Sequence, residues 1–247
     1  RKVIEDLTSS TVRTQPPTQP RWNVPYPRNP LFTGREHILE RLAEVLDTGE
    51  TTALAQPQAI SGLGGIGKTQ TAIEYAYRYR SKYQAVLWAR ADTRENLVLN
   101  YVAIAHLLDL PEQHQQNQPR IVETVKQWLR EHRQWLLILD NADDLSMVGD
   151  FLPGTDTGHV LLTTRAQAMG RLARRIELDR MEQAEGSLFL LRRAGILQAD
   201  DALDKASSQE QTRALAIVQT MDGLPLALDQ AGAYIEETGC GLSSYLT

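Results

Sequence analysis

Hydrophobic residues follow two different spacings along this chain, and the two alternate up to about residue 180. Short apolar runs, typical of strands buried on both faces, are separated by segments whose apolar residues recur every three or four positions, as on one face of a helix. Strands that alternate with helices need crossover connections, so this region predicts an α/β fold with a parallel sheet. The predicted strands are residues 58–61, 85–90, 134–139, 159–164 and 176–178.

The segments between these strands predict amphipathic helices. The first follows Thr33 and Glu36, which have the spacing of a capping box, and Gly49 is expected to end it. A glutamine-rich stretch at 112–118 predicts a loop between the last two helices of this region. The other predicted helices are 68–79, 94–108 and 120–131.

After about residue 180 the strand pattern stops and only helical spacing remains. Helices are predicted over 182–194, 208–222 and 225–238. The second opens with a capping box at Ser208 and Gln211 and is followed by Gly223, while the third starts with Pro225 and stops at Gly239. The change of pattern predicts a small all-helical domain at 181–247 behind an α/β domain at 31–180.

The first thirty residues have a different composition. Six prolines lie between positions 16 and 30, which disfavours helix and favours extended chain. The chain also begins with Arg1 rather than Met. We therefore expect residues 1–30 to be a linker from an N-terminal domain that this sequence lacks.

Charge and cysteine content narrow the classes of function. The chain has 26 basic and 31 acidic residues, a net charge of −5, which argues against a nucleic-acid partner. Its apolar runs are too short to span a bilayer and no secretory signal opens it, so no membrane partner is expected. Cys240 is the only cysteine, which excludes an internal disulfide and fits a cytoplasmic location.

The strongest chemical signal is the segment 62–69, which matches Gly-x-x-x-x-Gly-Lys-Thr between a predicted strand and a predicted helix. Glycines let the backbone curl with N–H groups toward phosphate oxygens, and the helix start faces the anion. Lys68 is expected to reach the β- and γ-phosphates and Thr69 to bind Mg²⁺. The sequence therefore predicts a P-loop site for ATP or ADP with Mg²⁺, and the residues expected to contact them are Gly62, Gly64, Gly65, Ile66, Gly67, Lys68, Thr69 and Gln70.

Asp140 is the candidate second ligand of Mg²⁺, together with Thr69. It ends the apolar run 136–140, and P-loop proteins hold the hydrated metal with an acid at a neighbouring strand end. Asn141 follows it where many P-loop ATPases have an acid that polarises the attacking water. This favours slow hydrolysis, unless Asp143 or Asp144 acts as the base.

Arg165 follows the predicted strand 159–164, beside the expected position of the P-loop. Its guanidinium is expected to reach the γ-phosphate and to report its presence. An exposed arginine without that contact is the alternative. Lys68, Asp140 and Arg165 are therefore the candidate catalytic residues. An Asn-Lys-x-Asp motif for guanine does not occur, which favours an adenine nucleotide.

The motifs, their order and their spacing resemble the NB-ARC group of STAND signal-transduction ATPases, which includes plant disease-resistance proteins, apoptotic protease activators and bacterial relatives. The most discriminating motif is Gly-Leu-Pro-Leu-Ala at 223–227, after a Thr-Thr-Arg strand end. The other matching segments are Phe-Thr-Gly-Arg-Glu at 32–36, the loop 62–69, Val-Leu-Trp-Ala-Arg-Ala-Asp at 86–92 and the run 136–140.

This resemblance implies an adenine pocket lined by Phe32, Thr33, Gly34 and Arg35, with Pro225 pressing on the base and Arg165 sensing the γ-phosphate. Thr33 to Glu36 could instead be only a capping box, and Pro225 only a helix start. The family usually continues into a winged-helix domain and repeats. We expect both to be absent from this sequence, which ends at Thr247.

The leading hypothesis is a regulatory switch of the innate-immunity type that binds ATP or ADP and hydrolyses ATP slowly. The resemblance implies that the full-length protein self-associates in its ATP state. A rapidly turning-over P-loop ATPase motor is one alternative, and the nucleotide-binding module of a transcription regulator is another.

Overall fold

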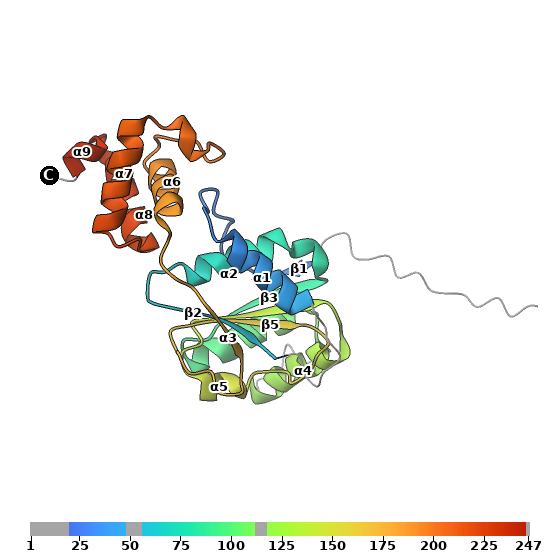
Figure 1. Ribbon diagram of the computed structural model, residues 1–247. Coiled ribbons are helices and arrows are strands. Elements are labelled where there is room, and N and C mark those ends of the chain that lie inside the picture. The colour runs from blue at the N-terminus through green and yellow to red at the C-terminus, as the bar shows by residue number, and fades with distance from the viewer. Residues whose placement is uncertain (1–19, 48–55, 112–117, 246–247) are drawn as a thin grey trace, which may run out of the picture.

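The computed structural model describes residues 20–47, 56–111 and 118–245. These residues form an α/β part and, after about residue 180, an all-helical part drawn in orange and red in Figure 1. The predicted fold class, a parallel sheet flanked by helices and followed by helices only, is confirmed.

The described strands form one sheet in which all neighbours are parallel, in the order β1-β3-β4-β5-β2-β6. Every residue of β4 is buried, because helices cover both faces of the sheet. This explains why the central strands read as continuous apolar runs rather than as alternating ones. The bounds are β1 (Arg21–Trp22), β2 (Gln58–Ser61), β3 (Ala85–Arg90), β4 (Trp135–Asp140), β5 (His159–Thr164) and β6 (Arg174–Glu177).

Successive residues of the central strands face opposite layers of helices (Figure 1). Leu136 and Ile138 pack with α1 and α2, whereas Leu137 and Leu139 pack with α3, α4 and α5. The sheet therefore separates two hydrophobic cores. The helices are α1 (Glu36–Asp47), α2 (Lys68–Arg78), α3 (Arg94–Leu107), α4 (Gln118–Glu131) and α5 (Leu145–Gly149), with a short 3₁₀ turn η1 (Arg80–Lys82) after α2.

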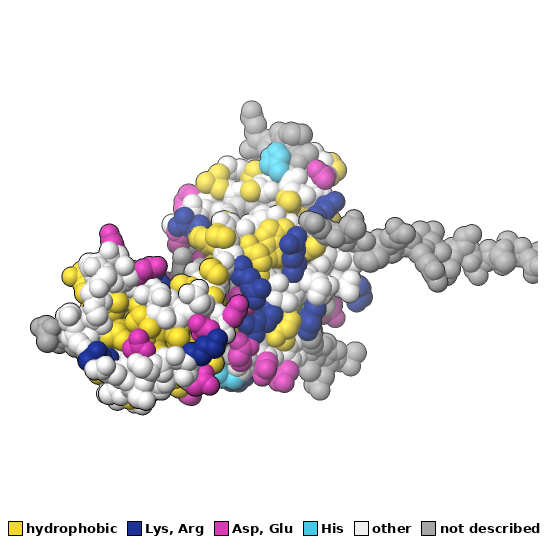
Figure 2. Space-filling view, turned by 90° about the horizontal axis from the view of Figure 1, so that it is seen from above, with side chains coloured by type: hydrophobic (Ala, Val, Ile, Leu, Met, Phe, Trp, Pro, Cys, Tyr) yellow, Lys and Arg dark blue, Asp and Glu magenta, His cyan; other side chains and the backbone are white. Residues whose placement is uncertain are grey.

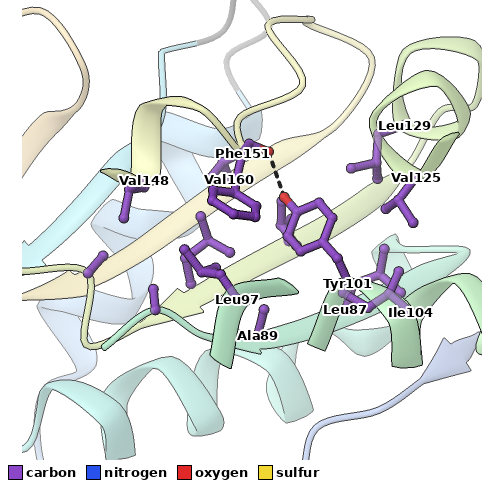
Figure 3. Close-up of a cluster of buried hydrophobic side chains, with 14 of the residues drawn as sticks. Leu87, Ala89, Leu97, Tyr101, Ile104, Val125, Leu129, Val148, Phe151 and Val160 are labelled. Atoms are coloured by element: carbon purple, nitrogen blue, oxygen red, sulfur yellow. Dashed lines mark hydrogen bonds between the residues drawn. The ribbon is translucent and has the colours of Figure 1, made fainter. Parts of the chain in front are cut away.

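Tyr101 of α3 lies in the core beneath the sheet, as Figure 3 shows. Its ring meets that of Phe151 edge-on, with centroids 5.4 Å apart. Its hydroxyl donates to the carbonyl oxygen of Phe151 at 2.6 Å, and burial raises the pKa of Tyr101. This hydrogen bond fixes the loop after α5 to α3.

The helical part has a hydrophobic core of its own, which begins at Met181. Gly186 lets α6 approach its neighbours closely, because a Cβ atom there would lie 2.9 Å from Val218 of α7. No helix in the described ranges is long and apolar enough to cross a membrane. The elements are α6 (Gln183–Arg193), the 3₁₀ turn η3 (Leu203–Lys205), α7 (Ser208–Thr220), α8 (Pro225–Thr238) and α9 (Leu242–Tyr245).

Residues 20–30, predicted as the end of a linker, lie against the α/β part. β1 adds a short strand beside β3, and Asn23 extends it by exchanging two hydrogen bonds with the backbone of Trp88 at 2.6 and 3.1 Å. Arg28 donates to both carboxylate oxygens of buried Glu74 at 2.8 and 3.0 Å. The prolines do not prevent this packing, because proline is tolerated in extended chain at a sheet edge.

The upper face of the molecule carries mixed charges. Arg78 of α2 pairs with Glu36 of α1 and also with Glu74 at 3.1 Å. Figure 2 shows Lys and Arg side chains next to Asp and Glu side chains on this face. Such pairing distributes charge locally rather than creating one extended basic surface.

Both predicted capping boxes are wrong in detail. α7 is capped one residue earlier, by Ser207 and Glu210, because the Ser207 side chain accepts from the Glu210 N–H while the Glu210 carboxylate accepts from Ser207. α1 begins at Glu36, so Thr33 lies too far ahead of it to be its cap. The predicted stop at Gly49 and the predicted loop at 112–117 lie outside the described residues, and Gln118 already belongs to α4.

We predict that Tyr101→Phe lowers the free energy of unfolding by about 1–2 kcal/mol, because the buried carbonyl of Phe151 loses its donor. Urea unfolding followed by circular dichroism measures the change. Tyr234→Phe is the matched control, because Tyr234 is exposed and its removal of a hydroxyl should leave stability unchanged. Equal stability of the two variants would contradict this role of the Tyr101 hydroxyl.

Candidate functional site

The glycine-rich loop 62–67 joins β2 to α2 at the carboxyl end of the sheet. Gly62, Gly65 and Gly67 have φ angles of 152°, 74° and 96°, which residues with side chains rarely adopt. A Cβ atom on Gly62 would also lie 2.7 Å from the carbonyl oxygen of Leu178. The path of the loop therefore requires glycine at these positions.

One side of this loop is open. A Cβ atom on Gly64 or Gly67 would meet no other atom within 4 Å. Gly67 precedes the first turn of α2 without a side-chain cap, so the backbone N–H groups of that turn have no intrahelical acceptor. Open N–H groups at the positive end of a helix dipole suit an anion such as a phosphate.

Lys68 lies across the loop. Its side chain is largely buried, and Nζ donates to the carbonyl oxygens of Gly62 at 2.9 Å and Leu63 at 2.8 Å. Burial lowers the pKa of Lys68, and nearby Arg165 lowers it further, whereas Asp143 and Asp140 act in the opposite direction. The ammonium group thus lies within electrostatic range of both strand-end motifs.

Asp140 ends β4 with its carboxylate almost fully buried. Its Oδ1 accepts from the hydroxyl of Thr69 at 2.8 Å and from that of Thr163 at 2.6 Å. The predicted pair of metal ligands, Thr69 and Asp140, is therefore in direct contact. Carboxylate and hydroxyl oxygens are suitable ligands for a hard cation such as Mg²⁺.

The residues after Asp140 are occupied by structural hydrogen bonds. Asn141 has a left-handed φ of 61°, and its N–H donates to the Thr163 hydroxyl at 2.9 Å. Asp144 caps α5 by accepting from the N–H of Met147 at 3.0 Å. Asp143 contacts the segment that follows β5, so neither of the two aspartates that could replace a missing base is without a partner.

Arg165 lies just beyond β5 and pairs with Asp143. Its backbone N–H donates to Oδ1 and its Nε to Oδ2, each at 2.6 Å. Burial alone would raise the pKa of Asp143, but hydrogen bonds from Arg165 and Thr164 outweigh it and lower that pKa. The carboxylate therefore stays ionised at neutral pH, which makes it a weak base.

A cavity of about 780 Å³ brings most of the predicted residues together. It is open on one side to solvent and is bounded by the loop, the strand ends and the first turn of α8. The predicted residues that line it are Gly64, Gly65, Gly67, Lys68, Thr69, Gln70, Arg165 and Pro225. Asp140 lies behind Thr69, and Ile66 is buried in the core with α1 and α2.

The predicted adenine-pocket segment, Phe32 to Arg35, does not line this cavity. Phe32 packs against the core of α1 and α2, and Thr33 accepts from Nη1 of Arg192 on α6 at 3.1 Å. The backbone N–H of Arg35 donates to Glu185 of α6 at 3.2 Å. The segment therefore lies where the α/β part meets the helical part.

Arg35 nevertheless has an unusual environment. It is 5% exposed, and its Nη2 has no hydrogen-bond partner among the described residues. Burial lowers the pKa of Arg35, while Glu185 and Asp179 raise it. A buried guanidinium nitrogen without an acceptor is energetically costly, so this atom fits a site that a polar ligand completes.

Sequence reasoning missed part of the cavity wall, which includes Asn29, Phe189 and Leu226. Leu226 follows Pro225 in the recognised motif, and its N–H donates to the carbonyl oxygen of Gly65 at 3.1 Å. The motif could have indicated Leu226. Phe189 gave no signal, because its spacing on α6 matches that of an ordinary core residue.

These features define a P-loop nucleotide-binding site: an open glycine loop, a lysine across it, and a threonine and aspartate in contact at one cavity. The chain belongs to the NB-ARC domain family, which it matches over residues 35–194. It is an NB-ARC-type STAND P-loop ATPase module.

Curated relatives support this assignment. The chain is 28% identical over 254 aligned residues to a "Nucleotide-binding leucine-rich repeat (NLR)-like protein" of Hyaloscypha variabilis, covering 91% of this chain and 24% of that protein. It is 27% identical to "Regulatory protein AfsR" of Streptomyces griseus, covering 81% and 20%. The chain thus spans about a quarter or less of the length of these relatives.

Solved structures show the same fold. A STAND protein with a tetratricopeptide repeat sensor from Pyrococcus horikoshii superposes with a TM-score of 0.55 and 19% identity, covering 82% of this chain and 30% of that one. The Orc1 protein of Aeropyrum pernix, solved in complex with DNA, gives 0.56 and 17%, covering 92% and 68%. At these identities the likeness establishes the fold alone.

We predict that Gly67→Ala lowers the free energy of unfolding by about 1–2 kcal/mol, because alanine is strained at a left-handed φ. Thermal unfolding without nucleotide measures the change. Gly64→Ala is the matched control, since Gly64 has no left-handed φ and has open space around it, and its stability should stay within about 0.5 kcal/mol. A larger loss for Gly64→Ala would contradict this account.

Proposed function

We propose that this chain is the nucleotide-binding part of a regulatory switch that alternates between ATP and ADP. The supporting observation is that a single cavity is lined by Lys68, Thr69 and Arg165 of the α/β part and by Pro225 and Leu226 of the helical part. A nucleotide in this cavity contacts both parts. Loss of its γ-phosphate then changes the free energy of their arrangement.

In this proposal the α/β part holds the phosphates. The open N–H groups at Gly64 to Gly67 bind phosphate oxygens, and Lys68 exchanges its loop carbonyl acceptors for the β- and γ-phosphates. Thr69 and Asp140 hold Mg²⁺, directly or through water. When bound, Mg²⁺ neutralises charge on the β- and γ-phosphate oxygens.

The base lies toward the apolar end of the cavity, formed by Phe189, Pro225 and Leu226. Adenine is the proposed base, since the sequence lacks the motif that reads guanine. The segment from Phe32 to Arg35 remains the predicted edge of this pocket, and the buried Nη2 of Arg35 supports a polar ligand nearby.

Hydrolysis is proposed to be slow. An amide at Asn141 cannot accept a proton from the attacking water. Asp143 is held by Arg165 and has a lowered pKa, and Asp144 is engaged as a helix cap. These contacts disfavour the alternative of a rapidly turning-over motor, which needs an available base beside Asp140.

We further propose that residues 31–180 and 181–247 act as two domains that move relative to one another, with residues 1–30 joining them to an N-terminal domain. Self-association in the ATP state and a cytoplasmic setting are part of this proposal. The curated relatives are four to five times longer than the matched region, so the output of the switch belongs to other segments of such proteins.

A role as the nucleotide-binding module of a transcription regulator is the second candidate. The relatives named regulatory protein AfsR favour it. In that case the DNA contacts come from other segments, because this chain has a net charge of −5 and mixed charges on the face that Figure 2 shows.

Lys68→Ala is expected to weaken nucleotide binding by about a hundredfold, because two charged hydrogen bonds to phosphate are lost. Titration with fluorescent ADP measures the affinity. Lys126→Ala is the matched control, since Lys126 lies on α4 and donates to the backbone of Asp150. Unchanged affinity in Lys68→Ala would rule out the P-loop assignment.

Arg165→Ala is expected to spare ADP binding and to weaken ATP binding by about tenfold, because only ATP offers a γ-phosphate to the guanidinium. Calorimetric titrations with ADP and a non-hydrolysable ATP analogue, both with Mg²⁺, measure the two affinities. Equal losses for both nucleotides would remove the proposed role of Arg165 as γ-phosphate sensor.

A further inference from the structure

Asp143 engages the proposed sensor arginine through several contacts at once. Nε and Nη2 of Arg165 both contact Oδ2 at 2.6 Å, and the Arg165 backbone N–H donates to Oδ1. These contacts use two of the three guanidinium nitrogens. An arginine held in this way must release donors before it can give the same donors to a phosphate.

The carboxylate itself is fixed in place. Oδ1 of Asp143 also accepts from the hydroxyl of Thr164 at 3.1 Å, and that hydroxyl accepts from the N–H of Ala166 at 3.0 Å. Asp143 therefore keeps its position at the end of β5 when the Arg165 side chain moves. The guanidinium can move, because the Arg165 side chain is 72% exposed.

The pair lies at the phosphate end of the cavity. Asp143 and Arg165 both line it together with Lys68 and Thr69. The opposite effects of Asp143 and Arg165 on the pKa of Lys68 place both charges within range of Nζ. A γ-phosphate bound by Lys68 would lie close enough to compete with Asp143 for the guanidinium.

We propose that Asp143 is a positioning residue that competes with the γ-phosphate for Arg165 and thereby lowers the preference of this site for ATP over ADP. This inference rests on the proposed function. ADP has no γ-phosphate and leaves the Asp143–Arg165 pair intact. ATP binding breaks the pair, so part of the gained contact is offset by the lost one, and the ADP state is favoured when both nucleotides are present.

Competition has a different signature from two other roles that Asp143 could have. If Asp143 aimed Arg165 at the phosphate, removing its charge would weaken ATP binding as Arg165→Ala does. If Asp143 only repelled the γ-phosphate through its charge, removing the charge would favour ATP whether or not Arg165 is present. Competition alone makes the effect depend on the arginine.

The test is Asp143→Asn in the wild-type chain and in the Arg165→Ala variant. Asparagine keeps an acceptor oxygen for Thr164 and for the Arg165 backbone N–H but loses the charge. Calorimetric titrations with ADP and with a non-hydrolysable ATP analogue, both with Mg²⁺, give the ratio of the two dissociation constants. We expect Asp143→Asn to raise the preference for the ATP analogue about three- to tenfold, and to leave the ratio unchanged when Arg165 is absent.

Asp144→Asn is the matched control. It removes the same charge from the neighbouring position, and asparagine still caps α5. Its ratio should stay within about twofold of the wild type, because Asp144 does not hold Arg165. A rise as large as that of Asp143→Asn would show a general charge effect and overturn the proposal.

Two further outcomes also overturn it: an unchanged or lower ATP preference in Asp143→Asn, or an equal rise with and without Arg165. Failure of the proposed function gives a different result. In that case the wild-type chain binds neither nucleotide, or Lys68→Ala binds as the wild type does, whereas failure of this inference leaves wild-type binding and the effect of Lys68→Ala intact.

Discussion

Two threonine hydroxyls converge on one buried carboxylate oxygen, Oδ1 of Asp140. Thr69 brings the start of α2 to this oxygen, and Thr163 brings the end of β5, so three elements meet there. A carboxylate that is 2% exposed is stable only with donors or a cation around it. The Thr163 hydroxyl also accepts from the N–H of Asn141, which sets the turn after β4. The positions of the glycine loop and of the segment from Asn141 to Asp144 follow from this arrangement.

The part of this arrangement that depends on strand ends could be predicted from the sequence. In a parallel sheet the carboxyl ends of all strands lie at the same edge, so the apolar runs before Asp140 and Arg165 place these residues near the loop after β2. Lys68 and Thr69 follow from the loop motif itself. The chemistry that each contributes is a property of its residue type, which is why the site could be expected without coordinates. The family resemblance added Pro225, which lines the same cavity.

Other features depend on contacts that no local pattern encodes. β1 has two residues, too few for a periodic signal, and it forms because β3 offers a free edge. Asp143 could have been a base or a structural residue, and only its distance from Arg165 decides between them. Phe189 has core-like spacing, and its place in the cavity wall results from how α6 approaches the α/β part. The capping register of α7 was missed by one residue, because adjacent serines at 207 and 208 offer equivalent caps.

The contact between Leu226 and Gly65 has a consequence for how such proteins can diverge. Leu226 donates to the carbonyl oxygen of Gly65, and its side chain would lie 2.9 Å from a Cβ atom at that position. Gly65 is therefore constrained twice, by its left-handed φ and by the helix that packs on it. Even an alanine there would push α8 away while leaving every charged group of the loop in place. The loop and the first turn of α8 are therefore expected to be inherited together, and a chimaera that takes one of them from a distant relative needs the other from the same source.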